Sequence, residues 1–161
     1  MAVFRVREAV ESDVPLVLDL IRELADYERL LREVRITEAG LRDALFGERR
    51  HAEVLIAEAP GGEALGFALF FHNFSTFLGR PGIYLEDLFV RPEHRGAGVG
   101  RALVAHLARL GAARGCGRLE WAVLDWNDAA IRFYRGLGAR PASGWTVYRL
   151  EGDAFGRLVD P

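Results

Sequence analysis

A glycine-rich stretch between an apolar segment and a helical pattern constrains the fold of this chain most. Residues 95–101 read Arg-Gly-Ala-Gly-Val-Gly-Arg and follow the strand-like residues 83–90. A helical stripe starts inside the stretch, and strand-like residues return at 118–125. The stripe consists of Val99, Leu103, Leu107 and Leu110. The pattern therefore predicts a strand, a glycine loop, a helix and a second strand in this order, which is typical of a sheet with helices packed on it.

Hydrophobic spacing and turn residues predict the other elements around this unit. Residues 14–28 carry an apolar helical stripe, and Ser12 is the expected N-cap of that helix. Thr37 is the expected N-cap of a second helix, and Asn127 that of a short helix closed by Gly138. Strands are predicted at residues 4–8, 52–59, 64–74, 83–90, 118–125 and 145–150.

The connections between the strands predict the sheet topology. Short turns with Gly and Pro join the strands at 52–59, 64–74 and 83–90, so these strands should run antiparallel. The later strand, helix and strand form a crossover, which adds parallel pairing. We therefore expect an α/β (α+β) fold with a mixed, mostly antiparallel central sheet and helices on both faces. At 161 residues, 50% of them hydrophobic, the whole chain (1–161) fits a single domain.

Composition excludes several classes of function. The 21 basic and 23 acidic residues give a formal charge of -2, which does not create the positive field that nucleic-acid binding requires. Charged residues stand where a secretory leader needs an apolar core, and the longest apolar run, around 67–71, is too short to cross a membrane. Cys116 alone cannot form an internal disulfide, and four scattered histidines show no metal-ligand spacing. We therefore expect a cytoplasmic protein without metal, and with neither nucleic acid nor membrane as a partner.

The glycine loop is a candidate anion site. A loop at the start of a helix directs backbone N–H groups outward beside the positive end of the helix dipole, and glycine lets a phosphate approach them. Arg95 and Arg101 flank the loop and can add charge-assisted contacts to a diphosphate. Arg101-Ala102 stands where a Walker loop needs Lys and then Ser or Thr, and Arg101 replaces the third glycine of the Rossmann motif. A glycine turn that only allows close packing is the alternative.

The loop resembles the phosphate loop of the GNAT acetyltransferase superfamily, which reads Arg or Gln, two residues, Gly, one residue, then Gly or Ala. Arg95, Gly98 and Gly100 match these positions. Further segments are similar to the spermidine/spermine N-acetyltransferase branch and extend the resemblance over nearly the whole chain. These segments are Tyr84-Leu85-Glu86-Asp87-Leu88-Phe89-Val90, Trp126-Asn127, Phe133-Tyr134 and Gly144-Trp145. The resemblance implies a GNAT-like sheet of six to seven strands, acetyl-CoA as co-substrate, a primary amine as acceptor, and a homodimer.

The resemblance also implies which residues bind acetyl-CoA. The diphosphate is expected on the backbone of the loop, and the pantetheine arm on the backbone at the end of the preceding strand. The residues expected to contact acetyl-CoA are Leu88, Phe89, Val90, Arg95, Gly96, Ala97, Gly98, Val99, Gly100, Arg101, Asn127, Ala130 and Tyr134.

Direct transfer to an amine needs a base and an acid. An alkylammonium has a pKa of about 10, so it must lose a proton before it attacks a carbonyl carbon. Glu86 and Asp87 are adjacent in a predicted strand and point to opposite faces; we choose Glu86 as the base, directly or through a water, with Asp87 as the alternative. The resemblance assigns proton donation to the CoA thiolate to Tyr134. The alternative, from the sequence pattern alone, is that Glu86 and Asp87 form ion pairs with arginines and that Tyr134 is a core aromatic residue.

The acceptor site is expected at the end of the first helix. The resemblance assigns the binding of a cationic substrate to Tyr27 and Glu28, to which Glu86, Asp87 and Trp145 add negative charge and an aromatic face. Solvated acids and a core tryptophan are the alternatives.

The chain departs from the polyamine enzymes just before this tryptophan. Ala142-Ser143 stands where those enzymes have a longer, acidic stretch, which favours a shorter diamine or a lysine-like amino acid as acceptor. Two other functions stay open: acetylation of a protein lysine or N-terminus, and noncatalytic binding of acyl-CoA. Cys116 lies between two glycines, and we expect it to be a structural thiol.

Overall fold

The structure is a computed structural model that describes residues 3–159. The chain divides into two compact units, Met1–Ala122 and Val123–Pro161. The first unit contains the sheet and three α-helices, and the second contains two short α-helices. No helix within residues 3–159 combines the length and the apolar character that crossing a membrane requires.

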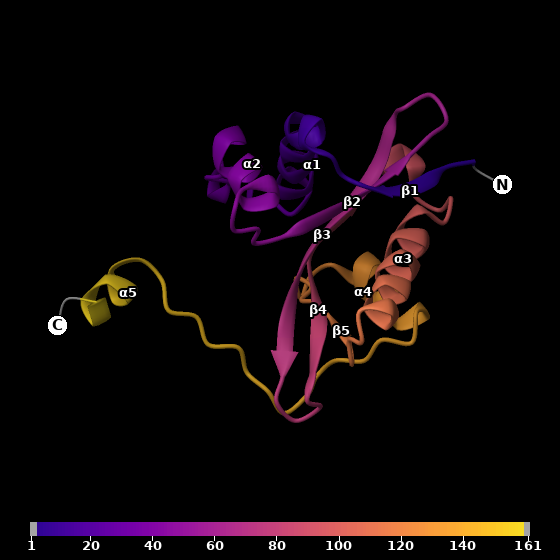
Figure 1. The fold of residues 1–161 in the computed structure, drawn as a ribbon. Helices are drawn as coiled ribbons and strands as arrows, with labels where there is room; N and C mark the ends of the chain where they lie inside the picture. The colour runs from indigo at the N-terminus through magenta and orange to yellow at the C-terminus, as the bar shows by residue number, and fades with distance from the viewer. Residues whose placement is uncertain (1–2, 160–161) are drawn as a thin grey trace. The chain divides into compact units, whose positions relative to one another are not determined.

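The first unit is built around a five-stranded sheet with the order β1-β2-β3-β4-β5 (Figure 1). Neighbouring strands are antiparallel except β4 and β5, which are parallel, so the predicted mixed and mostly antiparallel sheet is confirmed. The elements of this unit are β1 (Arg5–Glu8), α1 (Val14–Tyr27), α2 (Glu38–Phe46), β2 (Glu53–Glu58), β3 (Ala64–Ser75), β4 (Arg80–Val90), α3 (Val99–Ala113) and β5 (Leu119–Glu120), with short 3-10 helices at Glu11–Asp13, Leu31–Glu33 and Pro92–His94.

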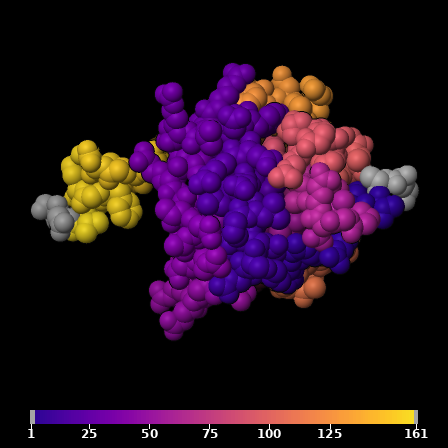
Figure 2. Space-filling model, turned by 90° about the horizontal axis from the view of Figure 1, so that it is seen from above, coloured from indigo at the N-terminus to yellow at the C-terminus, as the bar shows by residue number. Residues whose placement is uncertain are grey.

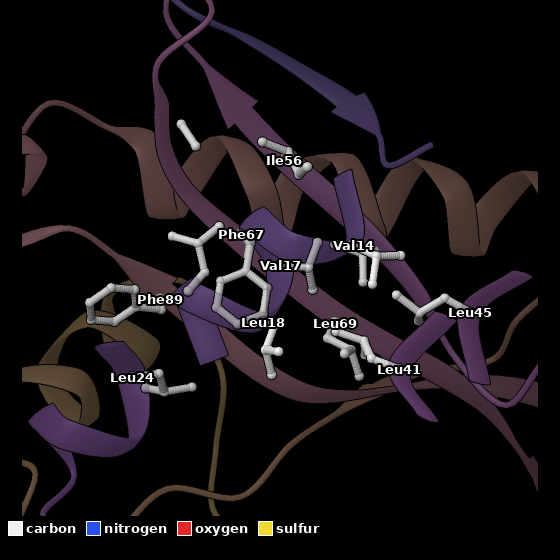
Figure 3. Close-up of a cluster of buried hydrophobic side chains, with 13 residues drawn as sticks. Val14, Val17, Leu18, Leu24, Leu41, Leu45, Ile56, Phe67, Leu69 and Phe89 are labelled. Atoms are coloured by element: carbon white, nitrogen blue, oxygen red, sulfur yellow. The ribbon is translucent and has the colours of Figure 1, made fainter. Parts of the chain in front are cut away.

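Helices cover both faces of this sheet, as the sequence predicts. α1 and α2 lie on one face and α3 on the other (Figure 1). Side chains alternate along β3: Phe67 and Leu69 pack under α1 and α2, whereas Ala68 and Phe70 pack under α3. Figure 3 shows the first cluster, with Val17 of α1 beside Phe67. In Figure 2 the early part of the chain, drawn in indigo and purple, lies together on the face in view. Each fully buried phenylalanine stabilises the fold by about 1.5–3 kcal/mol.

β4 contains a bulge at Glu86. The register between β3 and β4 shifts after Leu69: Asp87 lies opposite Leu69, but the next pair uses Leu85, so Glu86 is an extra residue without a partner. Leu85 packs under α3, whereas Leu69 and Phe89 belong to the core under α1. Asp87 shares the register of Leu69 and Phe89, so the bulge directs it to the face that α1 covers.

The start of α1 differs from the prediction. Ser12 lies inside a 3-10 helix, and the residue before α1 is Asp13. The Asp13 carboxylate accepts the backbone N–H of Val10 at 2.8 Å and both terminal guanidinium nitrogens of Arg7 at 2.7 and 3.0 Å. A carboxylate bound to both an arginine and a backbone N–H is held more strongly than a serine hydroxyl. The chain therefore turns from β1 into α1 around Asp13, and the expected N-cap at Ser12 is wrong.

The second unit contains α4 (Asp128–Gly136) and α5 (Gly152–Val159). Asn127 caps α4 as predicted, since its side-chain oxygen accepts the N–H of Ala130 at 3.2 Å. Gly138 follows α4 with a φ of +90°, which is the left-handed position that ends many helices. The predicted N-cap at Thr37 in the first unit is also confirmed, because its hydroxyl accepts the N–H of Gly40 at 3.1 Å. The sequence pattern does not predict α5.

Two predicted strands are missing or shortened, so the expectation of six to seven strands is wrong: the described sheet has five. Residues 118–125 form a strand only at Leu119–Glu120, which pairs with Ile83 and Tyr84 of β4. Residues 145–150 have no regular structure, and their side chains are exposed. Alternation shows that a segment can form one apolar face, but a strand also needs a neighbouring edge for its backbone hydrogen bonds.

Candidate active site

The loop between β4 and α3 presents its backbone to solvent. Gly96 and Gly98 have φ values of +78° and +85°, which residues with side chains rarely adopt. A Cβ atom added at either glycine would meet nothing within 4 Å, so this side of the loop is open. Gly98 is the N-cap of α3 and has no side chain that could accept the first N–H groups of this helix. The open cradle at the start of a 15-residue helix fits a diphosphate, as the sequence predicts.

The end of β4 lies beside this loop. Phe89 is buried in the core under α1, while Leu88 and Val90 are half-buried and pack under α3. β5 pairs with β4 only at Ile83 and Tyr84, so the ladder with β5 stops before the bulge. Beyond the bulge, β4 has backbone groups that β5 does not bind. This geometry fits the pantetheine contacts that the resemblance implies for the end of β4.

Arg95, the first residue of the loop, contacts both the end of β4 and the end of α1. Its Nε donates a hydrogen bond to the carbonyl oxygen of Val90 at 2.9 Å. The guanidinium carbon lies 4.5 Å from the centre of the Tyr27 ring and 5.7 Å from that of the Phe89 ring. These distances are typical of cation–π contacts. Arg95 therefore connects Tyr27, expected in the acceptor site, with residues expected in the acetyl-CoA site.

A tight helix end holds Tyr27 and Glu28. Arg29 has a φ of +62°, and the N–H groups of Arg29 and Leu30 donate to carbonyls of the last turn of α1 at 3.0 and 2.7 Å. This pair of bonds is a Schellman motif, with Arg29 in the left-handed position that glycine more often occupies. The motif sets the direction in which the chain leaves α1.

Asp87 has a strongly perturbed carboxyl group. Burial, together with the negative charges of Glu86 and Glu28, raises the pKa of Asp87 from 3.8 to about 7. Burial also raises the pKa of Glu28. Glu86 itself is exposed at the bulge. A carboxyl with a pKa near neutrality can both accept and release a proton at physiological pH, which is a property of general bases.

The family of the chain follows from comparison with known proteins. A sequence model of the Acetyltransferase (GNAT) family matches residues 18–139, a range that includes the glycine loop and all of β4. The chain belongs to the GNAT acetyltransferase family. It is therefore an N-acetyltransferase, and GNAT acetyltransferases use acetyl-CoA.

Two relatives agree with the GNAT assignment, and one solved structure shares the fold of the chain. Thialysine N-epsilon-acetyltransferase of Bos taurus is 43% identical over 169 residues, covering 99% of this chain and 99% of the relative. Spermidine/spermine N(1)-acetyltransferase-like protein 1 of Homo sapiens is 32% identical and covers 94% of this chain, while the match spans 23% of that protein. An integron cassette protein from the mobile metagenome of V. cholerae has a TM-score of 0.83 and 27% identity, covering 100% of this chain and 99% of that one. The expected kinship with the spermidine/spermine acetyltransferase branch is confirmed.

The first unit of this GNAT enzyme brings together predicted residues of both substrate sites. The residues that meet at the ends of α1 and β4 are Tyr27, Glu28, Asp87, Phe89, Val90 and Arg95. Val99 is buried at the start of α3, and Gly100 and Arg101 lie in the same turn. Ala97 is exposed in the loop.

The other predicted site residues of this GNAT enzyme belong to the second unit. Asn127 and Ala130 are joined by the cap of α4. Tyr134 lies in α4 with its ring centre 5.3 Å from that of Phe133, and it is half-buried. Trp145 is 78% exposed.

Sequence reasoning missed two features of the site. One is the bulge that turns Asp87 toward α1, and the other is the contact of Arg95 with Tyr27. No local pattern marks either feature, because both depend on the strand opposite β4 and on the packing of α1 against the sheet.

Proposed function

We propose that this GNAT enzyme transfers the acetyl group of acetyl-CoA to a primary amine of a small cationic acceptor, such as a short diamine or a lysine-like amino acid. The observation that carries the proposal is the meeting of an open phosphate loop and a cluster of carboxylates at one end of β4. The loop suits an anionic co-substrate, and the carboxylates suit a cationic acceptor. The relatives support this acceptor class, because thialysine is a lysine-like amino acid and spermidine and spermine are polyamines.

The proposed acetyl-CoA site combines loop, strand and helix residues. The backbone of the loop and the first turn of α3 hold the diphosphate, and the backbone at the end of β4 holds the pantetheine arm. Its members in the first unit are Leu88, Phe89, Val90, Arg95, Gly96, Ala97, Gly98, Val99, Gly100 and Arg101. The sequence resemblance also assigns Asn127, Ala130 and Tyr134 to acetyl-CoA binding. The open glycine backbone and the absence of a β5 partner beyond Tyr84 support it among the described residues.

The proposed acceptor site holds one ammonium group by charge and by aromatic contact. Glu28 and Asp87 are close enough that the charge of one raises the pKa of the other, and the Tyr27 ring already faces a cation in the structure. Glu86 and Trp145 complete the proposed set. A cation in this site relieves the repulsion between the carboxylates, which is a gain that a neutral acceptor does not offer.

For the proton acceptor, the structure and the sequence favour different carboxylates. The sequence favours Glu86, with Asp87 as the alternative. We infer that Asp87 is the base, because its pKa of about 7 matches the pH at which a base must work and because the bulge turns it toward α1. Glu86 contributes by keeping that pKa high.

The proposed reaction is a direct attack in a ternary complex. Asp87 accepts a proton from the ammonium, and the freed nitrogen lone pair attacks the thioester carbon and forms the C–N bond. A backbone N–H at the end of β4 stabilises the tetrahedral oxyanion. Collapse breaks the C–S bond, Tyr134 protonates the leaving CoA thiolate, and the nitrogen releases its second proton, which restores the phenol.

The test is a screen of acceptors with the purified protein and acetyl-CoA, following free thiol release. Diamines, polyamines, lysine analogues and peptides are compared, and small cationic amines are expected to give the highest kcat/KM. Activity on peptides alone would contradict the proposal in favour of protein acetylation.

Tyr134→Phe separates catalysis from mere acyl-CoA binding. Loss of the proton donor should lower kcat by about 10²- to 10⁴-fold while calorimetry shows unchanged CoA affinity. Tyr148→Phe, which removes the same hydroxyl from an exposed tyrosine of the same unit, is the matched control and should retain activity. CoA binding without turnover in the wild type would favour the noncatalytic alternative.

We also propose that residues 1–161 act as a single domain in a cytoplasmic homodimer. The family match crosses the boundary between the two units, which supports one domain. Phe74 and Phe77 at the hairpin of β3 and β4 are 65% and 88% exposed, which supports a covering subunit. Light scattering tests the dimer, and a monomer at micromolar concentration would contradict it.

A further inference from the structure

Arg95 makes contacts that belong to two different substrates of the proposed reaction. Its Nε is bound to the Val90 carbonyl at 2.9 Å, at the end of β4 where the pantetheine arm is proposed. Its guanidinium lies 4.5 Å from the centre of the Tyr27 ring, where the acceptor ammonium is proposed. Arg95 is also the first residue of the glycine loop, which is proposed to hold the diphosphate.

The present position of the Arg95 guanidinium is unfavourable for the acceptor ammonium. A cation that lies over the Tyr27 ring occupies the ring face that would attract the acceptor ammonium, and two positive charges on one face repel each other. A diphosphate in the loop offers Arg95 a stronger partner than an aromatic ring, because an arginine binds phosphate oxygens through charge-assisted hydrogen bonds. The Arg95 side chain is exposed, and the contacts that hold it over Tyr27 are the two ring contacts and the Val90 hydrogen bond.

We propose that Arg95 is a positioning residue that couples the two substrates: it leaves the Tyr27 ring for the diphosphate when CoA binds, and the amine then binds more tightly. This inference rests on the proposed function, since it concerns how the two ligands of the same site affect each other's binding. Until CoA binds, Arg95 acts as an internal competitor of the acceptor. Once Arg95 has moved, the Tyr27 ring and the carboxylates of Glu28 and Asp87 are all directed at the amine.

Coupling of this kind has a thermodynamic signature. If CoA removes a competitor of the amine, it must tighten amine binding, and the amine must tighten CoA binding by the same factor. The contacts that Arg95 gives up are its cation–π contacts with Tyr27 and Phe89 and one hydrogen bond to a carbonyl. Contacts of these kinds correspond to a factor of about 5 to 50.

Calorimetry with thialysine as the probe tests the coupling directly. CoA itself, which carries no acetyl group, is the second ligand and keeps the reaction off. In the wild type, CoA should lower the Kd of thialysine by about 5- to 50-fold. In Arg95→Ala, thialysine should bind the CoA-free protein about tenfold more tightly than in the wild type, and adding CoA should leave its Kd unchanged.

Three further variants make the result specific to Arg95. Arg95→Gln keeps a donor for the Val90 carbonyl but removes the cation, so it should lose the coupling as Arg95→Ala does. Arg109→Ala removes the same charge from an exposed residue of α3 and should keep the wild-type coupling. Arg101→Ala should weaken CoA binding but leave the affinity of the CoA-free protein for thialysine unchanged.

Two other measurements report on Arg95 without relying on calorimetry. In a ¹⁵N spectrum, the Nε–H signal that disappears in Arg95→Ala should shift when CoA is added to the wild type and stay in place when thialysine is added alone. In initial-rate experiments with acetyl-CoA as the varied substrate, a dead-end amine should give mixed inhibition in the wild type, with an intercept inhibition constant about 5- to 50-fold lower than the slope inhibition constant. In Arg95→Ala the two constants should be equal.

The outcomes separate this inference from the proposed function. A wild type that does not bind CoA, or that transfers no acetyl group to any small amine, would overturn the proposed function. An active wild type whose coupling survives in Arg95→Ala and in Arg95→Gln would overturn the role of Arg95 alone. A fixed Nε–H signal on addition of CoA would overturn it as well.

Discussion

Replacing Asp87 with asparagine tests the perturbed carboxyl on which the proposed chemistry depends. In the unfolded chain this group has its ordinary pKa of 3.8, whereas the folded protein raises the pKa to about 7. Between these two values the folded protein holds the proton that the unfolded chain has released, so the free energy of unfolding falls as the pH rises. Above about pH 7 both states are ionised and the loss is complete.

The size of the effect follows from the shift and the burial of the group. A change in pKa from 3.8 to about 7 corresponds to about 4 kcal/mol in full. Asp87 keeps partial contact with solvent, which screens its charge and lowers the expected effect to about 2–4 kcal/mol. Between pH 5 and 8 the free energy of unfolding of the wild type should fall by about 1–2.5 kcal/mol through this group. Asparagine has the same shape without the charge, so the stability of Asp87→Asn should exceed that of the wild type by an amount that grows over this range.

Urea unfolding followed by tryptophan fluorescence at pH 5, 6, 7 and 8 measures this difference. Asp26→Asn is the matched control, because it removes the same charge from an exposed carboxylate near the end of α1 and should keep the pH dependence of the wild type. Equal pH dependence in Asp87→Asn and the wild type would refute the assignment of a raised pKa to this residue. The same variant should also lose the limb near pH 7 in the pH profile of kcat/KM if Asp87 is the base.

Three further substitutions, one of them with a matched control, test the loop and the helix starts. Gly98→Ala forces a side chain into a φ of +85° and should lower the free energy of unfolding by about 1 kcal/mol, while its methyl group on the open side of the loop should weaken CoA binding in calorimetry at least severalfold. Gly62→Ala, with a φ of +87° and equally open surroundings, should have the same effect on stability and none on CoA, so equal CoA affinities for the two variants would contradict the cradle. Asp13→Asn should destabilise by about 1–2 kcal/mol at pH 7 in urea unfolding, because it weakens the bonds to Arg7. Arg7 lowers the pKa of Asp13, so the wild type loses the free energy contributed by this ion pair as the pH falls through that lowered pKa. If the urea unfolding curves of the wild type and Asp13→Asn still differ in strong acid, the ion pair is not the cause of the difference. Thr37→Ala should lower the free energy of unfolding by about 1 kcal/mol, and an unchanged urea midpoint would show that the cap of α2 adds nothing.

Local patterns predict most of the first unit correctly. The helix stripes of α1 and α3 and the apolar segments of β2, β3 and β4 are confirmed, because each element carries its own periodicity and its own turn or cap residues. Thr37 and Asn127 are confirmed as N-caps, since a side-chain oxygen three residues before a free N–H is a local interaction. The cap expected at Ser12 is wrong because Arg7, a residue of a different element, recruits Asp13 in its place.

The strand predictions fail where a partner edge is missing. The alternation at residues 145–150 favours a strand, yet no strand pairs with this segment within residues 3–159, whereas β3 lies between β2 and β4. A strand is completed by hydrogen bonds to a neighbour that is distant in the sequence, so its formation cannot be deduced from the segment alone.

The sequence by itself determines the glycine loop, its position between a strand and a helix, and therefore where we propose the anion site, because positive φ values and exposed N–H groups need only neighbouring residues. Only the tertiary structure decides which carboxylate turns toward α1 and where the Arg95 side chain lies. The register of β4 against β3 creates the bulge at Glu86, and the packing of α1 on the sheet brings Tyr27 within reach of Arg95. Both depend on contacts between residues far apart in the chain, which no spacing along one segment records.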